Sequence, residues 1–465
     1  MTNQDVPRSP SSSINPGLTR RNVLKGMAGV AGLASFSGFL AACSSAASPG
    51  ASTGASAAAS AAASAAASGA GGSLNLGSNL SDAVPKKALQ DVVDAFTAQT
   101  GIKVKVNTVD HSTFQNQLTS YLQGKPDDVF TWFSGFRMRF FAGQGLATQI
   151  DDVWAKVGAQ FTDAFKTAST SDDGHQYLVP YVTYAWTVYY RKSLWASKGY
   201  QIPATLADLK TLAAKMQSDG LVAIGLGDKD GWPAMGHFDI LNLRENGYQF
   251  HVDLMSGKAK WADPKVTKVF TVWKDLLPFY QAGAAGRVWQ DAAAGLVQKK
   301  TGMMLQPQAA ETFTAAGAAD FADLDFFPWP NHGTQWDDEK ALDAPIDGFM
   351  IAKNSPTLTQ NLDAAKAFLE FMGKGATQTT YVKANPSLVA AAKDADQTQY
   401  TPLQKHQTQV LADAKKLTQF LDRDTDPRFA TQNGMQAFLI DFIQNPSQDL
   451  TAFQAKIQSF WDSMK

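Results

Sequence analysis

Cysteine and histidine are scarce in this sequence, and their scarcity excludes several kinds of chemistry. The chain of 465 residues has 1 Cys and 6 His. A single cysteine excludes an internal disulfide and a thiolate metal cluster. The histidines are scattered, with no H-x-H or H-x-x-x-H pair, so a zinc motif is missing. The sequence therefore predicts no metal site and no cofactor.

The chain also has little excess of charge of either sign. It has 41 Lys+Arg against 42 Asp+Glu, a formal net charge of −1. Nucleic-acid-binding proteins usually carry a strongly basic face, so we expect no nucleic-acid partner. No phosphate-binding G-x-x-x-x-G-K-[ST] and no hydrolase G-x-S-x-G is present. The hydrophobic share of 44% is instead typical of a globular protein with large cores.

The first 42 residues have the features of a bacterial export signal. Arg20 and Arg21 lie in a basic segment, and residues 27–42 carry no charge. This order, with small residues at the end, is typical of a signal peptide, and the alternative is a short N-terminal anchor helix. The segment 19–25 resembles a twin-arginine export signal. The segment 40–43 resembles a lipobox, so we expect residues 1–42 to be removed and Cys43 to carry a lipid.

The next segment predicts a tether. Residues 43–72 are almost entirely Ala, Ser and Gly after the cysteine, and they lack the large apolar groups that a core requires. Such a composition is typical of a flexible linker. We therefore expect a globular body held outside the cell membrane by the lipid at Cys43.

From residue 73 onward, helical and extended patterns alternate. Residues 84–96 place apolar side chains on one helical face, and residues 102–107 alternate between apolar and polar. The β-rich run 178–190 is long for one strand and could lead from one domain into the next. A second helix and strand follow at 206–216 and 221–226. This alternation predicts an α/β fold with mainly parallel sheets.

Aromatic residues stand in loop-like settings near several of the predicted strand ends. Trp132 precedes a Ser-Gly pair, Trp232 lies between Gly and Pro, and Trp289 begins a Trp-Gln-Asp sequence. In α/β sheets, ligands bind beyond the carboxyl ends of the strands. Flat aromatic faces there suit the C–H faces of sugar rings, and nearby carboxylates and amides suit the hydroxyls. For each tryptophan the alternative is packing in a core or between domains.

A set of stretches also occurs in a particular order. They are residues 127–132, 145–146, 150–151, 179–195, 206–212, 225–228, 289–293, 326–330 and 347–355. Together with the signal and tether, they resemble the extracellular sugar-binding lipoproteins of ABC importers, in the maltose-binding-protein-like group. The resemblance covers the body from residue 73 to residue 465.

The resemblance implies a periplasmic-binding-protein-like fold of two α/β lobes with the ligand between them. Lobe one would comprise residues 73–182 and 330–374, and lobe two residues 183–329 and 375–465. The protein would capture a sugar or oligosaccharide and deliver it to the membrane permease, as a monomer without enzymatic activity.

The resemblance also implies a set of ligand-binding residues. They are Trp132 in lobe one, Tyr184 and Trp186 near the crossing, Trp232 and Trp289 in lobe two, and Asp347 and Gly348 in the returning segment, with Asp291 and His111 as weaker candidates. No ligand contact carries over to residues 306–311, because Glu311 stands where some relatives place a structural aromatic.

Two other functions stay open at this point. A lipid-anchored glycoside hydrolase would also use aromatic residues for sugar, together with a pair of carboxylates. A binding protein for a polyamine, peptide or phosphate ester would need several carboxylates or basic groups around the aromatics. The candidate residues are mostly neutral and aromatic, which favours an uncharged polyol.

Overall fold

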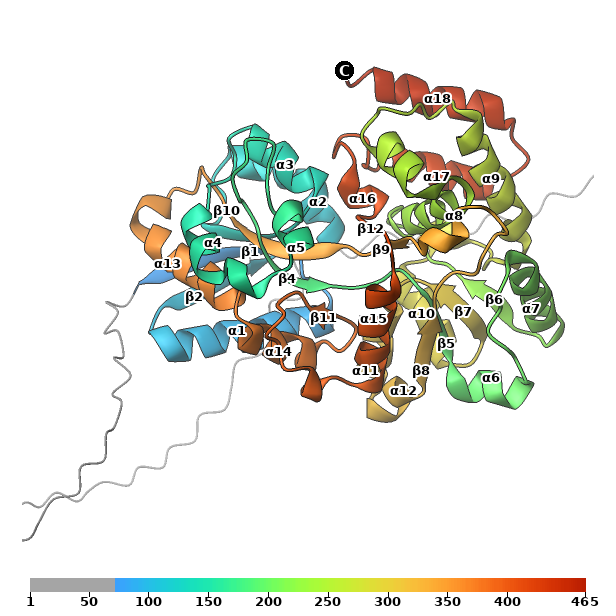
Figure 1. Cartoon of the computed structure of the whole chain (residues 1–465), viewed down its shortest axis with the longest axis horizontal. Coiled ribbons are helices and arrows are strands. Elements are labelled where there is room, and N and C mark those ends of the chain that lie inside the picture. The colour runs from blue at the N-terminus through green and yellow to red at the C-terminus, as the bar shows by residue number, and fades with distance from the viewer. Residues whose placement is uncertain (1–71) are drawn as a thin grey trace, which may run out of the picture. The chain divides into compact units, whose positions relative to one another are not determined.

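Two main β-sheets organise the part of the chain that the structure describes (Figure 1). The computed structural model describes residues 72–465, so the predicted signal peptide, Cys43 and nearly all of the linker lie outside the described residues. The first sheet has the order β11-β4-β10-β3-β1-β2, and the second has the order β6-β7-β5-β8. The strands are β1 (Ser73–Ser78), β2 (Lys103–Thr108), β3 (Val129–Phe133), β4 (Val179–Thr183), β5 (Val188–Arg191), β6 (Val222–Gly225), β7 (Thr301–Leu305), β8 (Leu324–Phe327), β9 (Leu342–Asp343), β10 (Ile346–Ile351), β11 (Val389–Ala390) and β12 (Leu417–Thr418).

Helices surround both sheets. They are α1 (Ala83–Thr100), α2 (His111–Gln123), α3 (Phe136–Gly143), α4 (Asp151–Val157), α5 (Asp163–Ala168), α6 (Lys192–Lys198), α7 (Leu206–Ser218), α8 (Pro233–Met255), α9 (Pro264–Leu276), α10 (Trp289–Val297), α11 (Ala309–Ala316), α12 (Ala318–Ala322), α13 (Leu358–Met372), α14 (Gly375–Ala384), α15 (Pro402–Asp413), α16 (Leu421–Asp424), α17 (Met435–Gln444) and α18 (Leu450–Asp462). Within residues 72–465, no helix combines the length and apolar character that crossing a bilayer would require.

The first sheet begins with the pattern that the sequence predicts. The helix expected at 84–96 and the strand expected at 102–107 are confirmed by α1 and β2. Strands β1, β2 and β3 are parallel, and α1 buries its apolar face, including Leu89, Val93 and Phe96. The expectation of a mainly parallel sheet is wrong, however, because β10 and β11 make only antiparallel pairs. These strands belong to segments that enter the sheet late in the chain rather than to successive β-α-β units.

The chain passes between the two sheets through the β-rich run at 178–190. Strand β4 lies in the first sheet and β5 in the second, so this run does lead from one sheet into the other. The chain later returns through β9, which pairs with β12, and then β10. The backbone N–H of Trp186 donates to the carbonyl oxygen of Asp343 at 2.9 Å, which joins the two passages. We call the elements around the first sheet the first lobe and those around the second sheet the second lobe.

One segment differs from the predicted lobe boundaries. Residues after 374 were expected in the second lobe, yet β11 pairs with β4 of the first sheet and α14 packs against α1. Tyr381 of α14 lies edge-on against Tyr181 of β4, with ring centroids 4.8 Å apart. Burial of this aromatic pair holds α14 on the first lobe, a tertiary contact that sequence periodicity does not report.

Candidate functional site

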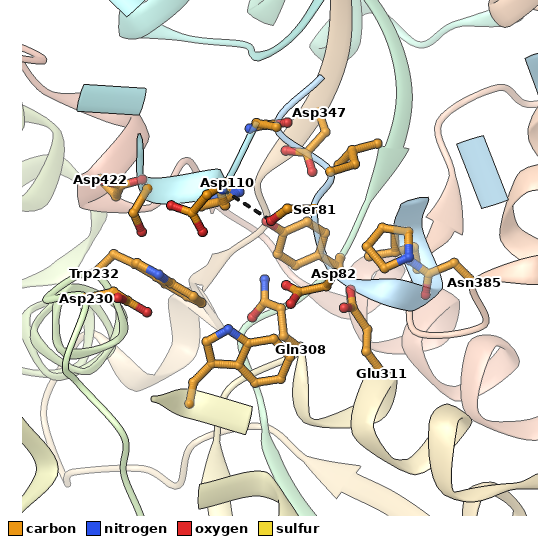
Figure 2. Close-up of a pocket in the computed structure, with 18 of the residues that line it drawn as sticks. Ser81, Asp82, Asp110, Asp230, Trp232, Gln308, Glu311, Asp347, Asn385 and Asp422 are labelled. Carbon is orange, nitrogen blue, oxygen red and sulfur yellow. Dashed lines mark hydrogen bonds between the residues drawn. The ribbon is translucent and has the colours of Figure 1, made fainter. Parts of the chain in front are cut away.

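A cavity lies where residues from both lobes meet (Figure 2). Its wall combines aromatic rings, carboxylates and amides from segments far apart in the sequence. The lining residues are Asn79, Leu80, Ser81, Asp82, Pro85, Asp110, His111, Ser112, Tyr181, Tyr184, Asp230, Trp232, Trp289, Gln290, Gln308, Glu311, Asp347, Tyr381, Asn385, Leu388, Phe420, Asp422 and Arg423.

The first-lobe wall follows the carboxyl ends of two parallel strands. Asp82 precedes α1, in the loop after β1, and Asp110 precedes α2, in the loop after β2. The Asp110 carboxylate accepts from the Thr113 backbone N–H at 2.9 Å and so caps α2. The His111 backbone N–H donates to Ser81 Oγ at 3.2 Å, which ties the two loops together (Figure 2). This is the sheet edge at which α/β proteins hold ligands.

The second-lobe wall is built at the beginnings of helices. Trp232 precedes α8, and Trp289 is the first residue of α10. Gln308 precedes α11, and Glu311 lies in its first turn. All four of these residues line the cavity. Figure 2 shows Trp232, Gln308 and Glu311 around one space, with Asp347 of the first lobe opposite.

Two contacts join the lobes across the cavity. Gln290 Nε2, from α10, donates to Asp82 Oδ1 at 3.0 Å. The rings of His111 and Trp232 lie with centroids 6.2 Å apart and an interplanar angle of 52°. The two walls of the cavity are therefore in contact with each other.

An arginine provides the main positive charge of the wall. Arg423, in α16, donates through Nη1 to Oδ1 of Asp347, and both side chains are largely buried. Its guanidinium carbon lies 3.8 Å from the ring centroid of Phe133. Neighbouring Asp422 is held in turn by Arg137, with Nη2 and Oδ1 3.0 Å apart. Two of the cavity carboxylates are thus neutralised by buried arginines, whose planar donors suit such pairs.

Glu311 has a different electrostatic setting. Burial, together with the nearby Asp82 and Asp347 carboxylates, raises the pKa of Glu311 to about 8, although the neighbouring Asn385 amide acts to lower it. At neutral pH the protonated form is therefore favoured. A protonated carboxyl can donate one hydrogen bond and accept others, unlike a carboxylate.

The structure places five of the nine sequence-predicted residues on the cavity wall. They are His111, Tyr184, Trp232, Trp289 and Asp347. Whether they bind a ligand stays a prediction.

The other four predicted residues lie elsewhere. Trp132 is buried and stacks on Phe133, with centroids 4.7 Å apart. Trp186 is buried between Phe420 and Gly236, behind Trp232. Asp291 is exposed on α10. Gly348 faces Leu178, whose side chain would clash with a Cβ at residue 348. These four residues support or flank the wall rather than line it.

Sequence reasoning missed the polar part of the cavity. Gln308 and Glu311 line the cavity, although the resemblance carried no ligand contact over to residues 306–311. The expectation of a mostly neutral wall is wrong. Six carboxyl groups line the cavity, from Asp82, Asp110, Asp230, Glu311, Asp347 and Asp422. Arg423 and the acidic loop residues belong to no sequence motif, although Asp110 does follow the predicted strand at 102–107.

Comparison with known proteins assigns the family. Residues 81–379 match the family of bacterial extracellular solute-binding proteins. The chain belongs to this family. The predicted resemblance to the solute-binding proteins of ABC importers is thereby confirmed.

One solved structure is similar in both sequence and fold. The bacterial solute receptor AcbH, described as having an exclusive preference for β-D-galactopyranose, is 43% identical and superposes with a TM-score of 0.81. The match covers 85% of this chain and all of AcbH. A chitin oligosaccharide binding protein, 20% identical with a TM-score of 0.74, shares the fold over 84% of this chain and all of its own. The predicted two-lobe α/β fold is confirmed by these superpositions.

Two curated relatives have lower identity. The alpha-glucosides-binding periplasmic protein AglE of Rhizobium meliloti is 24% identical over 80% of this chain and 83% of its own. An uncharacterized ABC transporter extracellular-binding protein of Pyrococcus horikoshii is 26% identical over 65% of this chain and 68% of its own.

Proposed function

We propose that this protein is the substrate-binding lipoprotein of an ABC sugar importer. It captures a sugar in the cavity between the lobes and delivers it to the permease in the membrane. The single observation that carries the proposal is the combination of Trp232 and Trp289 with several carboxyl groups on one interlobe wall. The 43% identity to AcbH, a receptor with a preference for β-D-galactopyranose, supports the same solute class.

The wall chemistry matches the two surfaces of a sugar ring. The indoles of Trp232 and Trp289 would stack on the C–H faces of the ring. Asp347 would accept hydrogen bonds from hydroxyls, while Gln308 can both donate and accept. Protonated Glu311 would donate to a hydroxyl or ring oxygen. His111 and Tyr184 complete the set of proposed contacts.

We propose a hexopyranose of the galactose type as the solute. The cavity has a volume of about 110 Å³, which is small beside the roughly 300–1,000 Å³ of sites for drug-sized ligands. The contacts of Asp82 with Gln290 and of His111 with Trp232 narrow the space between the lobes. Both features favour a short sugar over a long chain.

Sugar binding would stabilise the closed arrangement of the lobes, which the permease would recognise. A ligand shifts such an equilibrium only through its differential affinity for the two states. Contacts from both lobes would supply that difference. Small-angle scattering with saturating D-galactose should give a smaller radius of gyration than scattering without sugar, and an unchanged radius despite measured binding would contradict closure.

The anchoring part of the proposal rests on the sequence before residue 72. Residues 1–42 would be removed after export and Cys43 would carry the lipid, with the receptor acting as a monomer on the outer face of the membrane. Cells that express Cys43→Ser should release the protein from the membrane fraction. If this variant sediments with membranes as firmly as the wild type, the lipid is not its anchor.

A panel of mono- and oligosaccharides in a thermal-shift assay tests the solute class. D-Galactose should raise the melting temperature of the full chain, because a ligand that binds only the folded state stabilises it. The same samples should release no reducing sugar from oligosaccharides. Release that a single carboxylate substitution abolishes would instead indicate a hydrolase.

One observation favours a second candidate, a cationic solute such as a polyamine. Burial and nearby Asp110 raise the pKa of Asp230, and Arg423 balances only part of the negative charge on the wall. Aromatic rings with carboxylates around them also suit an ammonium group. Spermidine therefore belongs in the same panel. A thermal shift with spermidine and none with any sugar would establish this alternative.

A further inference from the structure

A second cluster of ionisable side chains lies away from the cavity wall. It consists of Asp239 and His251 from α8 and Asp343 from β9. One oxygen from each carboxylate and one imidazole nitrogen all lie within 4.8 Å of one another, and the three side chains are fully buried. Carboxylates are almost never fully buried without a compensating charge.

The fold brings these residues together through a break in α8. Asp239 and His251 are 12 positions apart in the sequence, and in a straight helix that separation would span about 18 Å. Gly247 interrupts the helix with φ 80° and ψ 169°, a conformation suited to glycine. The segment after Gly247 therefore turns back. His251 Nδ1 comes to lie 3.9 Å from Asp239 Oδ1.

Most of the polar atoms in the cluster have no hydrogen-bond partner among residues 72–465. Both carboxylate oxygens of Asp343 lack one, and so do Asp239 Oδ1 and His251 Nε2. The other Asp239 oxygen accepts from the Leu421 backbone N–H at 2.6 Å. Such orphaned buried groups are costly, and each one calls for a neutralising partner.

No basic side chain donates a hydrogen bond to these carboxylates among the residues that the structure describes. Arg244 donates instead to the backbone carbonyls of Ala341 and Trp329.

We propose that Asp239, His251 and Asp343 form a buried structural site for a divalent transition-metal ion such as Zn²⁺. Four donor atoms are available: Asp239 Oδ1, both oxygens of Asp343, and His251 Nδ1, whose 3.2 Å contact with Asn242 would give way. Imidazole with carboxylates suits zinc better than magnesium or calcium, which prefer ligands made only of oxygen. Zn²⁺ needs ligand distances of about 2.0–2.2 Å, so small side-chain rotations would close the site.

The ion would fasten the passage between the lobes to α8. Asp343 ends β9 and its carbonyl oxygen already accepts from Trp186 on the other passage. The segment leads directly into β10, which carries Asp347 on the cavity wall. Metal binding at Asp343 would therefore hold in place the strand that presents Asp347.

Metal analysis and zinc titration of the purified full chain test the proposal. After treatment with EDTA and dialysis, the wild type should bind one Zn²⁺ per chain in calorimetry. A Zn²⁺ concentration about 100 times the dissociation constant should raise the melting temperature by about 3–5 °C, and Mg²⁺ should not. Asp343→Asn should lose this response while melting within about 2 °C of the EDTA-treated wild type, because Asn is nearly isosteric with a protonated carboxyl.

A second variant of the cluster and a control variant at a histidine outside it complete the zinc-binding test. His251→Gln should also lose the response, and it decides the question if Asp343→Asn does not fold. His406→Gln removes a partly exposed histidine paired with Asp325 and should leave zinc binding unchanged. Failure of the wild type to bind Zn²⁺, or equal binding by wild type, Asp343→Asn and His251→Gln, would overturn the proposal. Loss of binding only in His406→Gln would place the zinc on the surface and overturn it as well.

Discussion

The tryptophans of the cavity and those of the second-lobe core are almost equally buried, yet they have different neighbours. Trp232 and Trp289 are 8% and 5% exposed, while Trp261 and Trp273 are fully buried. Trp261 lies between Phe238 and Phe429, and Trp273 packs on Phe442. The cavity tryptophans instead share a wall with carboxyl and amide groups. Burial alone therefore does not separate a binding site from a core, whereas the polarity of the surroundings does.

The largest effect is expected in the core. Trp273→Ala removes a large buried side chain and leaves a cavity, so it should lower the free energy of unfolding by about 3–5 kcal/mol. The affinity of the folded fraction for sugar should stay close to wild type. Chemical denaturation gives the first quantity and calorimetry with D-galactose the second. If Trp273→Ala is as stable as wild type but binds sugar weakly, Trp273 belongs to the binding site rather than to the core.

The cavity tryptophans should show the opposite behaviour. Trp289→Ala and Trp232→Ala should each weaken sugar binding about tenfold to over a hundredfold, since losing a stacking face costs about 1–3 kcal/mol. Their melting temperatures without sugar should change less than that of Trp273→Ala. Trp289→Phe is the matched control, because it keeps an aromatic face and should retain more affinity than Trp289→Ala. Equal affinities for these three proteins and wild type would show that Trp289 is only a packing residue.

The Glu311 carboxyl on the cavity wall should make the stability of the protein depend on pH. Because its pKa in the folded protein is raised to about 8 from the ordinary 4.5, folding takes up a proton between these values. This group's contribution to stability therefore falls as pH rises from about 4.5 to about 8. Glu311→Gln removes that contribution, so its stability relative to wild type should increase with pH.

Melting curves of both proteins at pH 5 and pH 8 measure this difference. Other buried carboxyl groups with raised pKa values, such as Asp228 and Asp424, are present in both proteins and cancel in the comparison. The groups that face Glu311, namely Asp82, Asp347 and Asn385, are also unchanged. A constant difference between the two proteins across this range would mean that Glu311 is ionised in the folded state.

The smallest effect is expected at the contact between the lobes. Gln290→Ala removes the hydrogen bond to Asp82, which is worth about 0.5–1.5 kcal/mol. If closure is linked to binding, sugar affinity should fall about two- to twelvefold. Gln298→Ala, at the exposed end of α10, is the control and should bind as wild type does. Identical affinities for both variants would show that the Asp82–Gln290 contact does not contribute to closure.

The fold was largely predictable because periodicity reports local structure. Helix α1, strand β2 and the passage at 178–190 follow from apolar patterns and β propensity. The placement of β11 and α14 on the first lobe was not predictable in this way, since it depends on Tyr381 meeting Tyr181. Such tertiary contacts carry no sequence period.

The residues of the cavity wall were partly predictable from the sequence, whereas the buried cluster of Asp239, His251 and Asp343 was not. Trp232 and Trp289 could be chosen because Gly, Pro or polar neighbours mark them as loop or helix-start residues. Trp132 and Trp186 have similar settings, yet Phe133 and Phe420 cover them. Glu311 and Arg423 gain their positions from distant packing. Likewise, Asp239 and Asp343 lie far apart in the sequence, so no metal-binding motif could identify their cluster with His251.

Calorimetric titration of the full chain with D-galactose tests the central claim most directly, with wild type and Trp289→Ala measured side by side. The account predicts binding of one sugar per chain by the wild type and at least about tenfold weaker binding by Trp289→Ala, with similar melting temperatures in the absence of sugar. Equal affinity in the two proteins, or no heat of binding with D-galactose or with any other sugar of the panel, would contradict it.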